Sequence, residues 1–204
     1  MAVIFLIRHG ETDYLGKRLA GRLPGIPLNE KGRLQAQQLA AKIGHLPFKH
    51  LYSSPIQRTL ETAAPLAAKT SLPVEVLPGL IEVDYGDWEG QTSEQIRSSE
   101  LWPMVHMVPS LVRFNGGESF PEVQERVVAA VESAAVGLER NELAAVFSHA
   151  DVIALAAAHY LNMPLDDFLR LNISTTSITV LQLDRPKVKV PYINLNDLPL
   201  SFDF

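Results

Sequence analysis

The chain has 204 residues, enough for one domain with a sizeable core, and it carries 18 basic and 23 acidic residues for a net charge of −5. No run is rich in lysine or arginine, so we expect neither a nucleic acid nor a membrane as partner. The lack of cysteine excludes disulfides, thiolate metal sites and cysteine nucleophiles. No window reaches the roughly 18 apolar residues of a membrane span, and the first apolar run lacks the features of a signal peptide, so we expect a cytoplasmic protein.

Short apolar runs alternate along the chain with longer segments of helical periodicity. This alternation is typical of a layered α/β domain, in which helices cover a central sheet. The apolar runs predict strands over Val3–Ile7, Leu51–Ser53, Val74–Leu77, Leu143–Phe147 and Ser177–Leu183.

Four helices are predicted between and after these strands. Asn29 is a favourable N-cap, and the helix that follows it should end at Gly44. The apolar positions of this helix recur at helical spacing, as expected of a face that packs on a sheet: Ala36, Leu39, Ala40 and Ile43. A second helix starts near Pro55, a third runs from about Ser119 to Leu138, and a fourth follows His149.

Two segments lack a clear period. Residues 83–117 contain both tryptophans together with Pro103 and Pro109, so we expect an irregular, lid-like insertion within one domain of residues 1–204. The tail of residues 186–204 mixes proline with isolated apolar residues, and no structure is predicted for it. Its apolar end, Leu198–Phe204, is a candidate surface for packing against a second copy, as in a homodimer.

The first strand is followed by Arg8-His9-Gly10, which is the most informative feature of the sequence. Such a corner places a cation and an imidazole side by side at the edge of a sheet, where Gly10 permits a sharp turn. A phosphate group suits this corner. Because an imidazole with an unperturbed pKa of ~6.5 is neutral in a substantial fraction of molecules, His9 can attack phosphorus and is the candidate nucleophile.

Further groups suited to a phosphate follow other predicted strands. Arginine can bind two oxygens with its planar fork, and α/β sheets hold ligands at strand ends, so Arg8 and Arg58 are candidate phosphate ligands. His149 precedes an alanine-rich helix, whose N-terminus also favours an anion. Taken singly, each residue also fits a surface salt bridge or a structural histidine, so the phosphate interpretation depends on their combination.

The leaving alcohol of a phosphomonoester needs a proton, which a carboxylic acid of raised pKa can donate. Glu82 is the preferred candidate for this acid. Asp84 is the alternative, since it lies two residues away and would face the same side of an extended segment. The sequence does not separate the two.

Ordered motifs connect these residues along most of the chain. They are Arg8–Thr12, Ser54–Thr59, Leu80–Glu82, Gly86–Gly90 and Val146–Ala150, with Leu28–Gly32 and Gly116–Ser119 in addition. This set resembles the histidine phosphatase superfamily, the phosphoglycerate mutase-like proteins. The resemblance implies a three-layer αβα sandwich with a mostly parallel central sheet. It also implies that His9 forms a phosphohistidine that water hydrolyses, that His149 donates a hydrogen bond to the phosphoryl group, and that Glu82 acts as acid and then as base. The carboxylates near the histidines lack the spacing of metal ligands, so no metal or other cofactor is expected.

The chain departs from the family pattern near this site. Leu15 stands where an asparagine that touches the phosphate is common, so either the backbone near Gly21 substitutes as donor or phosphate binding is weaker by about 1–2 kcal/mol. The usual glycine after the second histidine is absent, and Asp151 is expected to cap the following helix or to orient that histidine. Arg113 in the lid-like segment is a candidate for binding a second charged group of the substrate.

These features favour a metal-independent phosphatase that acts on a small phosphorylated substrate. A mutase of the phosphoglycerate type is the first alternative, although mutases of that type are generally longer than this chain. A non-catalytic protein that binds a phospholigand is the second alternative, and it would not need a proton donor such as Glu82 beside the leaving group. The sequence does not identify the natural substrate.

Overall fold

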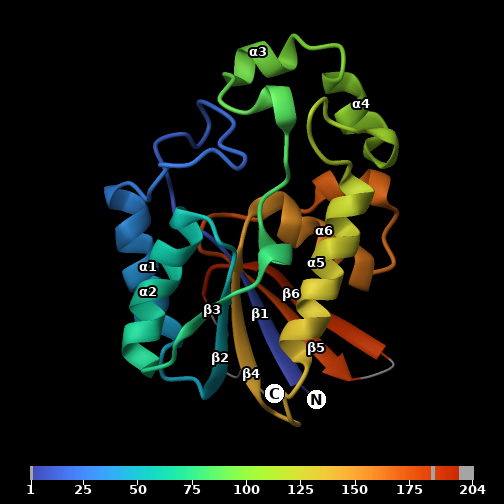
Figure 1. The fold of residues 1–204 in the computed structure, drawn as a ribbon. Helices are drawn as coiled ribbons and strands as arrows, with labels where there is room; N and C mark the ends of the chain where they lie inside the picture. The colour runs from blue at the N-terminus through green and yellow to red at the C-terminus, as the bar shows by residue number, and fades with distance from the viewer. Residues whose placement is uncertain (1, 185–186, 198–204) are drawn as a thin grey trace.

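The computed structural model of the protein describes residues 2–184 and 187–197. Its centre is a six-stranded sheet of order β3-β2-β4-β1-β5-β6. The strands are β1 (Ala2–Arg8), β2 (Phe48–Ser53), β3 (Val74–Val76), β4 (Leu143–Ser148), β5 (Ile178–Asp184) and β6 (Lys187–Leu195). Neighbouring strands from β3 to β1 are parallel, whereas β5 runs antiparallel to β1, and β6 antiparallel to β5. The predicted, mostly parallel sheet is confirmed (Figure 1).

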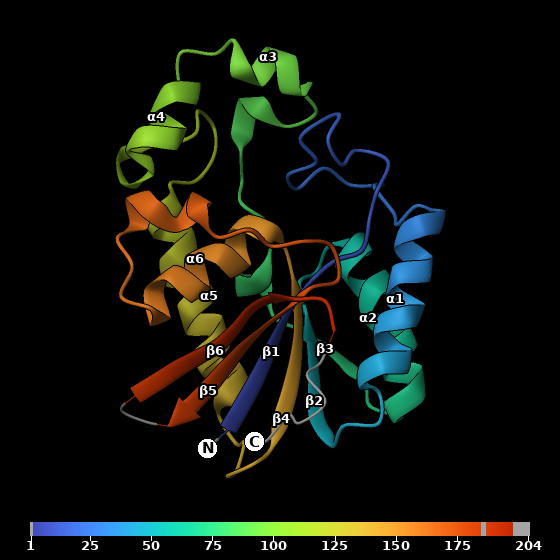
Figure 2. The same ribbon diagram turned by 180° about the vertical axis from the view of Figure 1, so that it is seen from behind.

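Two pairs of long helices cover the two faces of this sheet. They are α1 (Glu30–Ile43), α2 (Gln57–Thr70), α5 (Phe120–Ala135) and α6 (Ala150–Tyr160). The first pair lies on one face and the second pair on the other, which gives the predicted three layers (Figures 1 and 2). Within the described residues, no helix is long and apolar enough to cross a membrane.

The central strand β1 contributes to both hydrophobic cores, because successive side chains of a strand point to opposite faces of the sheet. Val3, Phe5 and Ile7 pack in the core beneath α1 and α2. Ile4 and Leu6 pack in the core beneath α5 and α6. Burial on both faces explains why the strand reads as a continuous apolar run. The carboxyl end of β1 is therefore anchored from both sides.

Predicted capping residues mark the ends of helices α1 and α5 in the structure. The Asn29 side chain accepts a hydrogen bond from the Gly32 N–H at 2.8 Å, and Gly44 is the C-cap of α1. Ser119 caps α5 in a reciprocal capping box, as its position before an apolar run allows. The helix ends at Ala135, before the predicted end, because the chain soon turns through a positive φ at a glycine.

The tail contains a strand that the sequence analysis did not predict. β6 pairs antiparallel with β5 at the edge of the sheet. Lys187 and Lys189 are exposed, whereas Val188 and Val190 pack against the core, so a period of two was present in the sequence. Pro191 is compatible with the strand because an edge strand leaves some N–H groups unpaired. The apolar end considered for a homodimer, Leu198–Phe204, lies outside the described residues.

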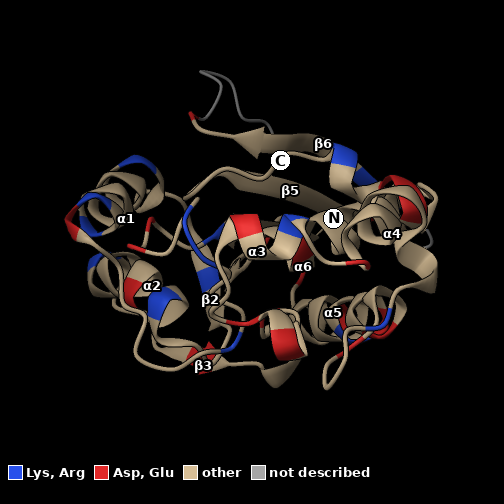
Figure 3. Cartoon of the chain, turned by 90° about the horizontal axis from the view of Figure 1, so that it is seen from above, with Lys and Arg blue, Asp and Glu red and all other residues tan. Residues whose placement is uncertain are grey.

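Residues 83–117, the lid segment, lie above the carboxyl ends of the central strands, with α3 over the sheet in the view from above (Figures 1 and 3). The segment is more regular than predicted. It contains 3-10 turns at Gly86–Trp88 and Pro109–Leu111, and the short helices α3 (Ser93–Arg97) and α4 (Trp102–Met107). Helices of this length do not complete enough turns to produce a recognisable apolar period. Two further 3-10 turns lie at Pro78–Leu80 and Leu165–Arg170.

Candidate active site

The predicted site residues come together above the carboxyl ends of β1, β2 and β4. The parallel register sets Arg8 at the end of β1 beside Ser148 at the end of β4, one residue before each histidine. Helix α2 starts shortly after β2 and contributes Arg58 from its first turn. A cavity of about 380 Å³ opens here, lined among others by Arg8, His9, Gly21, Arg58 and Glu82.

His9 is held as a neutral imidazole whose Nε2 carries a lone pair. Its Nδ1 lies 2.7 Å from the Gly10 carbonyl oxygen, and because a carbonyl only accepts, Nδ1 carries the hydrogen. Arg58 Nε donates to Nε2 at 3.1 Å. Burial, reinforced by the positive charges of Arg58 and Arg8, holds the pKa of His9 well below its usual range. This is the protonation state that a nucleophilic imidazole requires.

His149 lies at the N-cap of α6 and is fully buried. Arg58 Nη2 donates to its Nδ1 at 3.2 Å, so Nε2 carries the hydrogen and donates to Ser54 Oγ at 2.8 Å. The centroids of the two imidazole rings, His9 and His149, lie 5.3 Å apart. Burial, and then the charge of Arg58, holds the pKa of His149 well below its usual range.

The two arginines lie beside these rings with donors to spare; Arg58 is buried and Arg8 is half-buried. Arg58 is 1% exposed, and its Nη2 also donates to the Gly21 carbonyl oxygen at 2.8 Å. Arg8 donates from Nη1 to the Ile173 carbonyl oxygen at 2.6 Å. Arg58 Nη1 and Arg8 Nε, both buried, have no hydrogen-bond partner among the described residues. Buried guanidinium donors are costly when unpaired, so this arrangement favours an anion in the cavity.

Metal binding has no comparable support in the arrangement of side chains. Within residues 2–184 and 187–197, no group of three or more His, Asp or Glu side chains is placed to hold a metal ion. The groups that line the cavity at its phosphate end are the guanidinium groups of Arg8 and Arg58 and the neutral imidazole of His9. They suit a phosphoryl dianion.

Glu82 brings a carboxyl group into the same cavity. Its Oε1 accepts from the Val83 N–H at 3.0 Å, and its Oε2 lies 3.6 Å from His149 Nδ1 and 3.9 Å from Arg58 Nη2. Burial and then the neighbouring Asp151 raise the pKa of Glu82 to about 7, against the opposing charge of Arg58. A carboxyl group with this pKa is largely protonated in mildly acidic solution and can donate a proton.

Asp84, the alternative acid, faces elsewhere. Its Oδ2 lies 3.3 Å from Arg22 Nη1, and its Oδ1 accepts from the Gly86 N–H at 3.0 Å. The expectation that it would face the same side as Glu82 is wrong, because the Asp84 carboxylate is held outside the cavity by Arg22 and the Gly86 N–H. Glu82 lines the cavity, and Asp84 does not.

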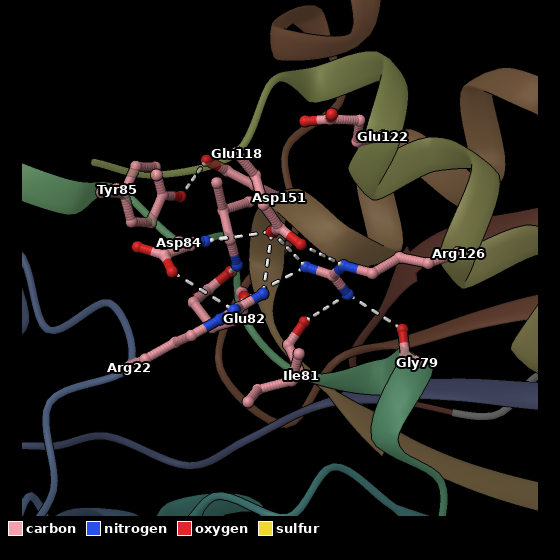
Figure 4. Close-up of polar contacts among 12 residues, drawn as sticks. Arg22, Gly79, Ile81, Glu82, Asp84, Tyr85, Glu118, Glu122, Arg126 and Asp151 are labelled. Atoms are coloured by element: carbon pink, nitrogen blue, oxygen red, sulfur yellow. Dashed lines mark hydrogen bonds and ion pairs between the residues drawn. The ribbon is translucent and has the colours of Figure 1, made fainter. Parts of the chain in front are cut away.

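A network of ion pairs fixes the backbone of Glu82, and the sequence analysis missed it. Arg126 Nη2 and Arg22 Nε both donate to the Glu82 carbonyl oxygen, at 3.0 and 2.8 Å. Both guanidinium groups also reach Glu118 Oε2, at 2.9 and 2.8 Å (Figure 4). Arg126 extends the hold along the chain by donating to the carbonyl oxygens of Gly79 and Ile81. Only Glu118 fell within a recognised motif, and nothing in the spacing marked the two arginines.

Gly21 and Leu15, which were discussed with the departures from the family pattern, both line the cavity. Gly21 has φ +47°, a conformation that favours glycine, and a Cβ there would also displace the Glu89 side chain. Its carbonyl oxygen accepts from Arg58, while donation by its backbone N–H to a phosphate stays a prediction.

Asp151 and Arg113 have partners other than those expected. The Tyr85 hydroxyl donates to Asp151 Oδ2 at 2.5 Å, so this carboxylate is tied to the lid segment (Figure 4). Burial raises the pKa of Asp151. The side chain of Arg113 is 60% exposed, pairs with Glu122 and is not among the residues that line the cavity. The expectation that Arg113 binds a substrate charge is therefore wrong.

Comparison with known proteins agrees with this geometry. Residues 4–196 match the family described as histidine phosphatase superfamily (branch 1). The chain belongs to the histidine phosphatase superfamily. Among the superfamily's curated members, a 2,3-bisphosphoglycerate-dependent phosphoglycerate mutase from Thermoplasma acidophilum is 29% identical, over 90% of this chain and 88% of that protein. Phosphoserine phosphatase 1 from Hydrogenobacter thermophilus is 28% identical, over 96% and 93%.

The same superfamily appears among solved structures. The structure of YhfR from Bacillus stearothermophilus superposes with a TM-score of 0.89 at 29% sequence identity, and covers 98% of each chain. The relatives of this member of the histidine phosphatase superfamily include a phosphatase and a mutase. Both relatives are named for reactions on phosphate esters, and the reaction, acceptor and substrate of this chain are argued from its site.

Proposed function

We propose that this chain is a metal-independent phosphatase that hydrolyses a small phosphomonoester through a phosphohistidine on His9. One observation carries the proposal: buried donors of Arg58 and Arg8 are unpaired within the described residues, and Arg58 also contacts the lone pair of His9 Nε2. A phosphoryl dianion would satisfy both donors and lie within reach of the nucleophile.

In the first step, His9 Nε2 attacks phosphorus, and the bond from phosphorus to the ester oxygen breaks. The Nδ1–H bond to the Gly10 carbonyl holds the ring in the reactive tautomer and stabilises the positive charge that develops on it. The two arginines bind the phosphoryl oxygens as charge shifts among them. Glu82 gives its proton to the leaving oxygen, which departs as a neutral alcohol.

His149 can also serve the phosphoryl group, provided that its hydrogen lies on Nδ1. Once Arg58 turns its donors to the substrate, Nδ1 no longer has to accept from Arg58 Nη2. The Ser54 hydroxyl can accept from Nε2 or donate to it, so this contact is compatible with both tautomers. We therefore assign His149 the role of a hydrogen-bond donor to the transferring group.

In the second step, a water oxygen attacks phosphorus and the nitrogen–phosphorus bond breaks. The Glu82 carboxylate takes a proton from this water, and His9 leaves as a neutral imidazole. Inorganic phosphate is released, and both residues return to their starting protonation states. One carboxyl group thus serves as acid and then as base.

A mutase is the second candidate, because a phosphoglycerate mutase is among the relatives at 29% identity. In that case the phosphohistidine would pass its phosphoryl group to a second substrate hydroxyl instead of water. The first step and the roles of the residues would be the same. The products distinguish the two.

The test is hydrolysis of 4-nitrophenyl phosphate in the presence of a chelator. Wild-type enzyme should release nitrophenol and phosphate, and His9→Ala should lose about 10³-fold or more in kcat because the nucleophile is gone. His45→Ala is the matched control, since His45 is an exposed histidine outside the cavity, and its rate should equal that of the wild type.

Each other result contradicts a named part of the proposal. Activity lost to the chelator would contradict metal independence. Activity retained in His9→Ala would exclude this nucleophile. Phosphoryl transfer between phosphoglycerates, dependent on 2,3-bisphosphoglycerate and without phosphate release, would identify a mutase.

A further inference from the structure

The cavity that holds the phosphate site extends into the lid segment, where its walls change in character. The upper walls are formed by aromatic and branched aliphatic side chains: Trp88, Ile96, Trp102, Val105, Phe114 and Phe120. They come from the lid segment and from the first residue of α5. The leaving group of a bound phosphomonoester points away from the nucleophile, so this is the space it would enter.

The aromatic wall is built in advance of binding. Trp88 packs edge-on against Phe114 at 5.2 Å between ring centroids, and Phe114 packs edge-on against Phe120 at 5.4 Å. Trp102 lies 6.3 Å from Trp88. Phe114 and Phe120 are each 1% exposed and are part of the main core, whereas the two indole rings are only partly buried. The core thus holds the wall in place while the indole rings offer surface to a ligand.

The charges around this upper part disfavour a second anion on the substrate. Glu82 and Asp151 are the carboxyl groups that line the cavity. Glu82 carries its proton when it acts as the acid, so the repulsion of a substrate carboxylate comes from Asp151 in its ionised form. The buried Arg58 and the half-buried Arg8 belong to the phosphate end. Arg18 and Arg97 also line the cavity, but both are exposed and contribute little to binding a desolvated charge.

We propose that this enzyme prefers phosphomonoesters whose alcohol carries an uncharged apolar ring, and disfavours phosphorylated hydroxy acids and amino acids. This inference rests on the proposed phosphatase function and names its substrate class. A ring fits the cavity, whose volume is about 380 Å³, and would stack on Trp102 and Trp88 while its phosphate occupies the arginine end. The chemical origin of the preference is burial of apolar surface together with the cost of placing a carboxylate there.

The experiment compares kcat/KM for 2-phenylethyl phosphate, ethyl phosphate and O-phosphoserine. The first two are esters of simple primary alcohols, so they make a similar demand on the proton donor and differ in the ring. Burial of the ring should raise kcat/KM by about 10- to 100-fold over ethyl phosphate. Phosphoserine should be hydrolysed no faster than ethyl phosphate.

Two substitutions on α4 test whether the side chain of Trp102 causes the preference for a ring. Trp102→Ala should lower the ratio of the phenylethyl to the ethyl ester about 10-fold, and Trp102→Phe should restore most of it. Met107→Ala is the matched control on α4, since Met107 is 67% exposed and does not line the cavity; its ratio should equal that of the wild type. Because a ratio is compared, a partly misfolded preparation does not alter the outcome.

A ratio near one in the wild type, or faster hydrolysis of phosphoserine, would overturn the inference while phosphatase activity itself stands. An unchanged ratio in Trp102→Ala would also overturn it. If the wild-type enzyme hydrolyses none of the three esters and no 4-nitrophenyl phosphate, the proposed function is contradicted, and the substrate class with it.

Discussion

At the scale of single residues, burial has opposite effects on the pKa values of the two groups that move protons. It lowers the pKa of His9 and raises that of Glu82, because removal from water disfavours whichever form carries charge. The result is a neutral imidazole with a lone pair on Nε2 beside a carboxylic acid with a proton to give. In water near neutral pH, the carboxyl group would have lost that proton. Burial thus prepares both the nucleophile and the acid by one physical effect.

The pH dependence of activity follows from these two shifts. Glu82 must be protonated to donate, so kcat/KM for ethyl phosphate should fall as pH rises through about 7. His9 must be neutral, and its lowered pKa should keep the enzyme active well below the usual range of histidine titration. Measurement of kcat/KM from about pH 4 to 9 would test both the fall on the alkaline side and the activity retained on the acidic side.

Glu82→Gln is the control for this assignment. Without the acid, kcat for ethyl phosphate should fall about 10²–10⁴-fold, and the limb near neutral pH should disappear. The second ionisation of the substrate phosphate, near pH ~6, would stay visible in both proteins. If activity of Glu82→Gln still falls at the same pH near 7, the titrating group is not Glu82.

At the scale of elements, the strand ends bring the phosphate ligands together, and the acid lies on the connection between Leu80 and the lid segment. The Ser148 hydroxyl donates to the Leu80 carbonyl oxygen at 2.8 Å, and this bond ties the segment just before Glu82 to the end of β4. Arg126 of α5 and Arg22 of the loop after β1 then hold the Glu82 carbonyl oxygen. The carboxyl group therefore has little freedom to leave the cavity, although it lies outside any helix or strand. We infer that these two arginines position the acid without touching substrate.

Arg126→Met tests this positioning role. The variant should lower kcat for ethyl phosphate about 10-fold or more, because an alkoxide leaving group depends on a well-placed acid. It should lower kcat for 4-nitrophenyl phosphate much less, since nitrophenolate leaves without a proton. Arg113→Met, which breaks the exposed pair with Glu122, should match the wild type on both esters. Equal losses on both esters would indicate general structural damage and contradict the positioning role.

At the scale of the whole molecule, the site places buried charge where the core would otherwise be apolar. Arg58 is among the largest fully buried side chains, with an unpaired donor. Such a group costs stability until an anion pairs with it. The lid segment shares a hydrophobic cluster with α5 and α6 through Val105, Val112 and Phe114, so we propose that the chain folds as one domain. Occupation of the site should then stabilise the entire fold.

Thermal unfolding measures this coupling. Inorganic phosphate at about 100 times its Kd should stabilise the protein by about 2.7 kcal/mol and raise Tm by roughly 5–10 °C. Arg58→Met should lose this rise. Arg170→Met is the matched control, because Arg170 is exposed and pairs at the surface with Asp167, and it should keep the rise. The same rise with sodium chloride of equal ionic strength would show a non-specific salt effect and contradict the coupling.

The sequence by itself determined the features that depend on local chemistry. The apolar runs, the Asn29 and Ser119 caps and the layered α/β class followed from periodicity and capping. The motif around Arg8 and His9, with the similar motifs that follow, indicated a phosphate site whose members do lie together in the structure. The strand β6 was predictable from its alternating residues and was missed because Pro191 obscured the pattern.

Only the tertiary structure decided which side chains face one another. It separated Glu82 from Asp84, gave Arg113 a surface partner, and brought Arg22 and Arg126 to the same carbonyl oxygen. These contacts join residues far apart in the chain, and their strength depends on burial, which one sequence does not display. Local propensity acts over a few residues, whereas pKa values, unpaired donors and pocket walls are set by everything that packs around them.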